Sequence, residues 1–188
     1  MSVAAWVDDE PVTADEVERR LRRLRGRDRT RALPVDGSRE GRQLRRWVTQ
    51  VAVVERLCVA EMAARGPAAA GIPAASPAAT SVGGPTRAEV AALGSIVAAA
   101  WANEPAVGRV ASTVTADVAL SPAERERAGR LAAGPDGRPV WSDDELLASA
   151  RIEAFSRWLA TATHTRVRLT EGYEHPGDST QPDNVHQH

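Results

Sequence analysis

The sequence contains no lysine, a single cysteine, one phenylalanine and one tyrosine among its 188 residues. A lone cysteine, Cys58, excludes an intramolecular disulfide and a cysteine-rich zinc site. All 24 basic residues are arginines, and Ala, Gly, Pro and Val are abundant. This composition is typical of a high-GC genome such as an actinobacterial one, so the missing lysine indicates no particular chemistry.

Net charge and long apolar runs are also lacking. The 24 basic residues are balanced by 25 acidic ones, which argues against wholesale electrostatic binding of nucleic acid. No stretch approaches 18 unbroken apolar residues, and the N-terminus has no signal-peptide pattern, so we expect a cytoplasmic protein without membrane contact. The length suits one helical domain over 1–169, followed by a polar tail over 170–188.

Helix starts are marked by a repeated pattern. A Ser or Thr followed three residues later by Glu forms a capping box, in which each side chain bonds to the backbone N–H of the other residue. Four such pairs precede apolar periodicity, which favours a mostly α fold. They are Thr13/Glu16, Thr86/Glu89, Ser121/Glu124 and Ser142/Glu145.

The periodicity predicts five to six helices with short strands at both ends of the chain. We expect the two strands, over 3–7 and 165–169, to pair with each other. Residues 67–85 are uncharged and rich in Ala, Pro, Gly and Ser, which predicts a flexible linker. The expected helices span 13–25, 38–65, 86–102, 106–116, 121–131 and 142–163.

The order of these elements resembles a known family. "VAAWVDDEPVTADEVERRLRRL" followed by "RQLRRWVTQVAVVERLCVAEMAARG" is similar to the N-terminal chaperone segment of SurA-like, parvulin-type foldases. "LSPAERERAG" resembles the charged helix that precedes their isomerase domain, and "ELLASARIEAFSRWLATATHTRVRL" resembles the helix and strand that complete the chaperone domain. The resemblance implies a SurA-like fold with an interhelical groove for apolar peptide. Only about ten residues stand where the isomerase domain would be, so peptidyl-prolyl isomerase activity is not expected.

Tryptophan is the main aromatic residue, with five copies. Trp47, Trp101 and Trp158 lie at apolar helical positions and are expected in the core, whereas Trp6 and Trp141 lie near element ends and suit a cleft. We expect the ligand groove to be lined from these five and from Tyr173.

The closing stretch "EHPGDSTQPDNVHQH" is rich in groups that ligate metals or transfer protons. His175, His186 and His188 are candidate zinc ligands, but the prolines and glycine indicate a loop, so we favour a solvated tail and predict no cofactor. If the chain is an enzyme, Glu174, His175 and Asp178 are the acid/base candidates. The "GYEHPGD" part, with the sole tyrosine, is expected to dock on the domain. The tail also resembles the ends of small actinobacterial proteins associated with aromatic polyketide pathways.

Arginines are concentrated early, with twelve of the 24 between Arg19 and Arg46. Nine acids in the first 50 residues offset them, so we favour a salt-bridged surface over nucleic-acid recognition. An anionic small molecule or an acyl carrier partner would also suit such a face. Cys58 lies on an apolar stripe and is interpreted as a buried structural thiol.

The leading hypothesis from these patterns is a non-catalytic binding module. It would hold an apolar peptide or small molecule between its helices. The alternative is a small enzyme or accessory protein of secondary metabolism with the histidine-containing loop at its site.

Overall fold

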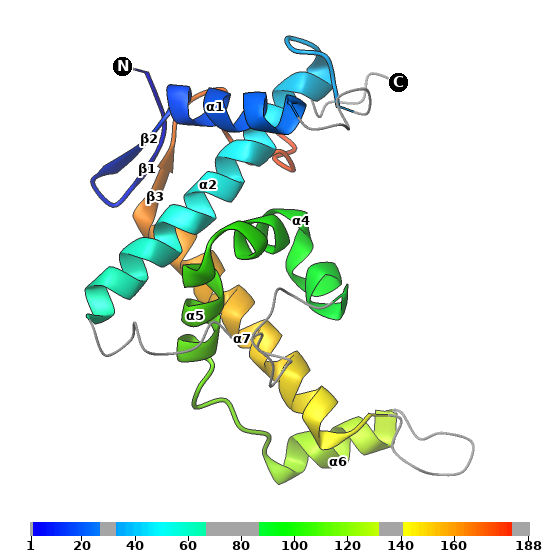
Figure 1. The fold of residues 1–188 in the computed structure, drawn as a ribbon. Coiled ribbons are helices and arrows are strands. Elements are labelled where there is room, and N and C mark those ends of the chain that lie inside the picture. The colour runs from blue at the N-terminus through cyan, green and yellow to red at the C-terminus, as the bar shows by residue number, and fades with distance from the viewer. Residues whose placement is uncertain (1, 27–32, 67–86, 132–140, 182–188) are drawn as a thin grey trace. The chain divides into compact units, whose positions relative to one another are not determined.

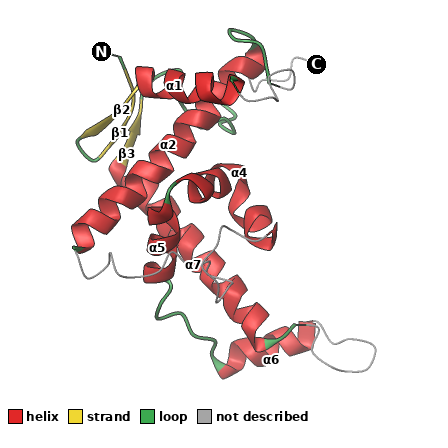
Figure 2. Cartoon of the chain, in the orientation of Figure 1, coloured by secondary structure: helices red, strands yellow, loops and turns green. Residues whose placement is uncertain are grey.

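A computed structural model of the chain describes residues 2–26, 33–66, 87–131 and 141–181. The described part of the chain is mostly helical, as predicted, and has one small antiparallel sheet (Figure 2). The predicted linker at 67–85 lies outside the described residues. The helices are α1 (Ala14–Arg25), α2 (Arg39–Arg65), α4 (Arg87–Asn103), α5 (Pro105–Val114), α6 (Pro122–Leu131) and α7 (Asp143–Arg166), and the strands are β1 (Val3–Val7), β2 (Glu10–Thr13) and β3 (Val167–Leu169) (Figure 1).

The chain divides into two compact units. The first consists of Met1–Leu57 and Thr163–His188, so both ends of the chain belong to it. The second consists of Cys58–Ala162. The sheet, α1 and most of α2 belong to the first unit, whereas α4, α5, α6 and most of α7 belong to the second.

The sheet has three strands in the order β2-β1-β3, so the prediction of a two-stranded pairing is wrong in its strand count (Figure 1). The predicted pairing of the two chain ends is present, with Trp6 of β1 opposite Arg168 of β3. On its other side β1 pairs with β2, where Trp6 lies opposite Pro11. Pro11 has no N–H to donate, which a strand tolerates at a sheet edge such as this one.

Two of the predicted capping boxes form in full, whereas at the start of α1 only half of one forms: the Glu16 N–H donates to the Thr13 hydroxyl at 3.1 Å, but the Glu16 carboxylate bonds to Arg20 and Arg56 instead. Ser121 and Glu124 exchange both bonds, with the Ser121 N–H donating to the carboxylate at 2.7 Å and the Glu124 N–H donating to the hydroxyl at 3.2 Å. Ser142 and Glu145 repeat this geometry at 2.8 and 3.3 Å. The serine hydrogen bonds lower the pKa of both glutamates below its ordinary value. Thr86 lies outside the described residues.

Helix α4 is interrupted at Gly94, whose φ of 80° and ψ of 166° are not helical. A left-handed φ of this kind favours glycine, because it has no Cβ. After the interruption Val97 and Trp101 are buried, as expected for Trp101, whereas Val90, before it, is 39% exposed.

Each unit has its own set of buried apolar side chains. In the first unit α1 buries Val17 and Leu21, and β1 and β2 bury Val7 and Val12. Along α2 the apolar positions Val48, Val51 and Val54 are buried in the first unit, and Cys58, where the second unit begins, is fully buried. In the second unit the largest enclosed side chain is that of Phe155.

None of the described helices alone is both long and apolar enough to cross a membrane. The consecutive helices Glu89–Asn103 and Pro105–Val114 reach the required composition only when taken together, and they bend by 117° at their junction.

Candidate functional site

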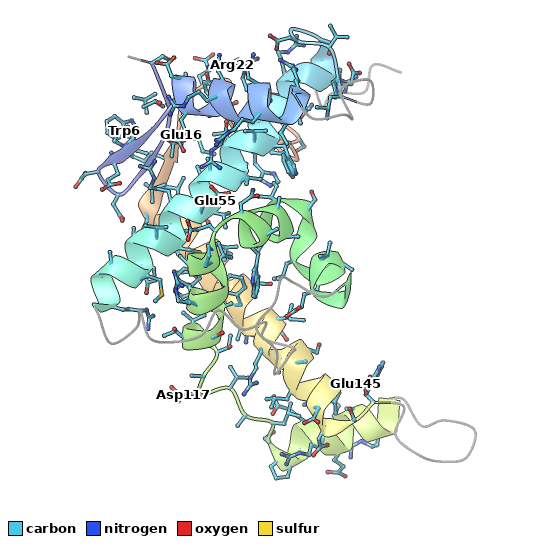
Figure 3. All side chains as sticks on the ribbon, viewed as in Figure 1. Trp6, Glu16, Arg22, Glu55, Asp117 and Glu145 are labelled. Carbon is cyan, nitrogen blue, oxygen red and sulfur yellow. The ribbon has the colours of Figure 1, made fainter. Side chains whose placement is uncertain are left out.

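Helix α1 is joined to α2 by a cluster of ion pairs. Arg20 of α1 bonds to Glu55 of α2 and, at 3.1 Å, to Glu16 one turn before it. Arg56 of α2 reaches the second oxygen of Glu16 at 3.1 Å. Figure 3 labels Glu16 on α1 and Glu55 on α2. The Glu55 residue is only 8% exposed, so the ion pair with Arg20 is largely buried.

A second ion-pair cluster fastens the other end of α1. Arg45 of α2 donates to Glu18 at 2.8 Å and to Asp36 at 3.1 Å, and Arg25 approaches the same Asp36 oxygen at 3.4 Å. The hydrogen bond to Glu18 raises the pKa of Arg45 above its ordinary value. This cluster holds the end of α1 and the loop before α2 against the start of α2.

The loop that precedes α2 is shaped by Ser38 and Gly41. The Ser38 hydroxyl donates to the Val35 carbonyl at 2.7 Å and accepts the Gly41 N–H at 3.0 Å, which is the geometry of a helix N-cap. A Cβ at position 41 would overlap the Val35 carbonyl oxygen. The loop can therefore approach α2 this closely only because residue 41 is glycine.

Between these elements lies an apolar pocket of about 540 Å³. We call it the Trp47 pocket. Its wall comes from the last turn of α1, the loop before α2, the first half of α2 and one residue of the C-terminal tail. Six of its eight residues are apolar, and the two polar ones both come from α2. The lining residues are Leu24, Leu33, Pro34, Glu40, Gln43, Leu44, Trp47 and Pro176.

The C-terminal segment, residues 170–181, is held on α2 by two buried polar side chains. Gln50 donates to the Tyr173 carbonyl at 3.3 Å. Arg46 donates to the Gln181 side-chain oxygen at 3.0 Å and lies 3.8 Å from the Glu174 carboxylate. The predicted docking part, residues 172–178, lies within this segment. Arg46 and Gln50 are each 5% exposed, so these bonds also satisfy polar groups that water does not reach.

The three acid/base candidates of the tail each form a local turn. Glu174 accepts the Gly172 N–H at 2.9 Å, and His175 Nδ1 accepts the Gly177 N–H at 3.0 Å. Asp178 accepts from both the N–H and the hydroxyl of Thr180, which lowers the pKa of this carboxyl below its usual range. Such short-range bonds are typical of turn-forming side chains.

Metal ligation was predicted only as a candidate role for the tail histidines. Over residues 2–26, 33–66, 87–131 and 141–181, no three His, Cys, Asp or Glu side chains lie close enough to hold an ion together. His175 is exposed in this part of the chain, and His186 and His188 lie outside the described residues.

The predicted groove residues are distributed over both units. Trp101 and Trp158 contact Phe155, with Trp101 edge-on at 5.8 Å and 78° and Trp158 stacked at 5.9 Å and 11°. Trp101 is 5% exposed, so this cluster belongs to the core of the second unit.

The remaining aromatic candidates have separate surroundings. Trp141 is 49% exposed and lines a smaller pocket of about 160 Å³ beside the Arg125–Asp143 ion pair. Trp6 is half-buried on the central strand of the sheet (Figure 3). Trp47 lines the pocket named after it, and Tyr173 lies half-buried in the C-terminal segment.

The early arginines separate into paired and outward-facing groups. Arg20, Arg25 and Arg45 pair with carboxylates on the first unit, as described above. Arg22, labelled in Figure 3, is exposed on α1, as are Arg19 and Arg23. Arg27, Arg29 and Arg31 lie outside the described residues. Ion pairing of the first group supports a salt-bridged surface.

Sequence patterns missed most of the pocket wall. Leu24 and Leu44 lie at apolar positions of α1 and α2, but α1 ends at Arg25 and leaves them half-buried. Sequence patterns also gave no role to Arg46 and Gln50, which hold the C-terminal segment. Gln50 could have been found as a polar residue among the apolar positions of α2, because a buried polar side chain needs a hydrogen-bond partner.

Known proteins resemble this chain over its N-terminal part. A family of unknown function (DUF7158) matches residues 3–40, which cover β1, β2, α1 and the first residues of α2. The curated proteins and the solved structures contain no match to this chain.

Proposed function

We propose that this chain is a non-catalytic binding module that holds an apolar ligand in the Trp47 pocket. The observation that carries the proposal is a pocket of about 540 Å³ with a mostly apolar wall, in a unit whose helices are cross-linked by ion pairs. This volume lies within the range of roughly 300–1,000 Å³ that is usual for ligand sites.

The wall chemistry supports a ligand with a substantial apolar part. Burying apolar surface contributes about 25 cal/mol per Å², so an aromatic ring or short alkyl chain would gain a few kcal/mol. Trp47 supplies a flat apolar surface, and Glu40 and Gln43 supply hydrogen-bond acceptors. A small molecule and an apolar side chain of an extended peptide both fit this description.

A dye titration tests the proposal. The fluorescent apolar probe 8-anilinonaphthalene-1-sulfonate should bind the wild-type chain, and Leu44→Gln should weaken that binding at least about fivefold, because it replaces apolar wall by an amide. Leu169→Gln is the matched control, since Leu169 is 37% exposed on β3 and does not line the pocket. Equal loss in both variants, or no loss in either, would contradict the assignment. Native mass spectrometry of the purified protein would identify a natural ligand that remains bound.

A SurA-like chaperone relationship is the more specific form of this proposal. The strand–helix–long helix opening and the return of β3 to β1 support it. Under this hypothesis the wild-type chain suppresses aggregation of an unfolded client protein, and Leu44→Gln suppresses it less. If the chain binds the dye but has no effect on client aggregation, the proposal of a binding module stands and the chaperone hypothesis is wrong.

A second candidate is an accessory enzyme of secondary metabolism. One observation favours it: Glu174, His175 and Asp178 flank Pro176, which lines the pocket, so acid/base groups lie close to a ligand site. Metal analysis of untagged protein separates the two hypotheses. Stoichiometric zinc that disappears in a His175→Ala, His186→Ala variant would favour the enzyme, and a metal-free protein that binds the dye would favour the binding module.

A further inference from the structure

The C-terminal segment is attached to α2 on both sides of the residue that lines the pocket. Before Pro176, the segment is held by the Gln50–Tyr173 hydrogen bond and by the approach of Arg46 to Glu174. After Pro176, it is held by the bond between Arg46 and Gln181. Arg46 and Gln50 are four residues apart, so they project from neighbouring turns of one face of α2.

The segment has no regular structure of its own. None of residues 170–181 is buried, and they contain no helix or strand. Segments held by a few polar bonds over a small apolar contact open locally at low free-energy cost. Pro176, the segment's contribution to the pocket wall, is half-buried.

We propose that the C-terminal segment is a strap that completes the Trp47 pocket, and that ligand binding and strap docking stabilise each other. This inference rests on the proposed binding function. A ligand that contacts Pro176 binds the docked state better than the open state, so by linkage it raises the docked population. Conversely, loss of docking lowers the affinity for the ligand by the same factor.

The chain's only tyrosine, Tyr173, lies in the strap and provides a specific probe. Incorporation of 3-fluorotyrosine gives a single fluorine label, whose resonance reports strap docking alone. Saturation with 8-anilinonaphthalene-1-sulfonate should shift or sharpen this resonance. Under the same conditions, amide hydrogen exchange across 170–181 should slow by at least about fivefold, since coupling factors start near that size.

Two glutamates of the strap form a matched pair of variants. Glu174→Ala removes the carboxylate that faces Arg46, and it should weaken dye binding about fivefold and speed exchange in the strap. Glu171→Ala changes an exposed residue three positions earlier and should leave both measurements at wild-type values. A chain that ends at Thr170 serves as a second test, because it removes the strap while leaving β3 in place.

The outcomes separate this inference from the proposed function. If the dye binds, Leu44→Gln weakens it, and strap exchange is the same with and without dye, the pocket stands and the coupled strap is wrong. Wild-type affinity in both Glu174→Ala and the shortened chain would also overturn the strap. If the wild-type chain binds no dye at all, the proposed function fails first.

Discussion

Arg166, in the last turn of α7, holds Asp8, in the turn between β1 and β2, by a two-point ion pair. Its Nε lies 3.0 Å from one carboxylate oxygen and its Nη2 lies 2.7 Å from the other. The backbone adds a bond from the Asp8 N–H to the Arg166 carbonyl at 2.8 Å. One residue pair therefore connects the beginning of the chain to the point where α7 becomes β3.

The Asp8 ion pair predicts a pH-dependent stability. The hydrogen bond from Arg166 lowers the pKa of Asp8 below its ordinary value of 3.8. A depressed folded-state pKa stabilises the fold above the unfolded pKa, and this contribution disappears as pH falls through the folded pKa. Asp8→Asn should therefore cost about 0.5 kcal/mol at pH 7, a small value because solvent screens the pair, and progressively less below about pH 4.

Asparagine suits this comparison because Asp8 has a φ of 53°, and asparagine tolerates that left-handed region. Urea unfolding at pH 7 and pH 3 measures the difference. Asp9→Asn removes a charge from the same turn without touching Arg166 and serves as the control. A cost for Asp8→Asn that is the same at both pH values would show that the charge is not responsible.

Gly41→Ala should destabilise the loop that forms part of the Trp47 pocket. The added methyl group would overlap the Val35 carbonyl oxygen, so the backbone must shift, at a cost of about 1–3 kcal/mol. Gly129→Ala in α6 is the control, because a Cβ there meets no atom within 4 Å and alanine favours a helix. Thermal unfolding should separate the variants, and equal stability would contradict the close approach at Gly41.

Phe155→Ala should unfold the second unit more easily. It removes the ring that both Trp101 and Trp158 contact, and truncation of a fully buried phenylalanine costs about 3–5 kcal/mol. Near-ultraviolet circular dichroism should lose the tryptophan signal that depends on this cluster. Val59→Ala, at a residue that is 43% exposed, should cost less than about 0.5 kcal/mol by the same measurement.

Glu55→Gln should loosen the attachment of α1 to α2. The substitution replaces the charged partner of Arg20 on α2 by a neutral amide in a largely buried position, which should cost about 1–2 kcal/mol. Glu153→Gln breaks an exposed pair with Arg157 within α7 and should cost less than about 0.5 kcal/mol. If both variants lose the same free energy of unfolding, the Arg20–Glu55 pair contributes no more to stability than the exposed Arg157–Glu153 pair.

Helix positions could be predicted from the sequence because their signals are local. A capping serine, a glutamate three residues later and an apolar repeat all lie within one helix, and the starts of α6 and α7 followed from them. The end of α7 did not: the helix continues to Arg166 and takes in the first two residues of the predicted strand 165–169, so β3 begins only at Val167. The strand β2 could not be predicted in this way. It has four residues, and only its pairing with β1 makes it a strand.

By itself, the sequence determined that the described chain is mostly helical, that residues 3–7 and the residues after the last helix form strands, and that one face of α2 is apolar. Only the tertiary structure decided how far α1 covers the apolar stripe of α2. Leu44 and Trp47 continue the stripe of α2, but α1 ends before it covers them, and the tail supplies Pro176 from 129 positions beyond Trp47. A pocket depends on contacts between residues far apart in the chain, and local periodicity carries no information on such contacts.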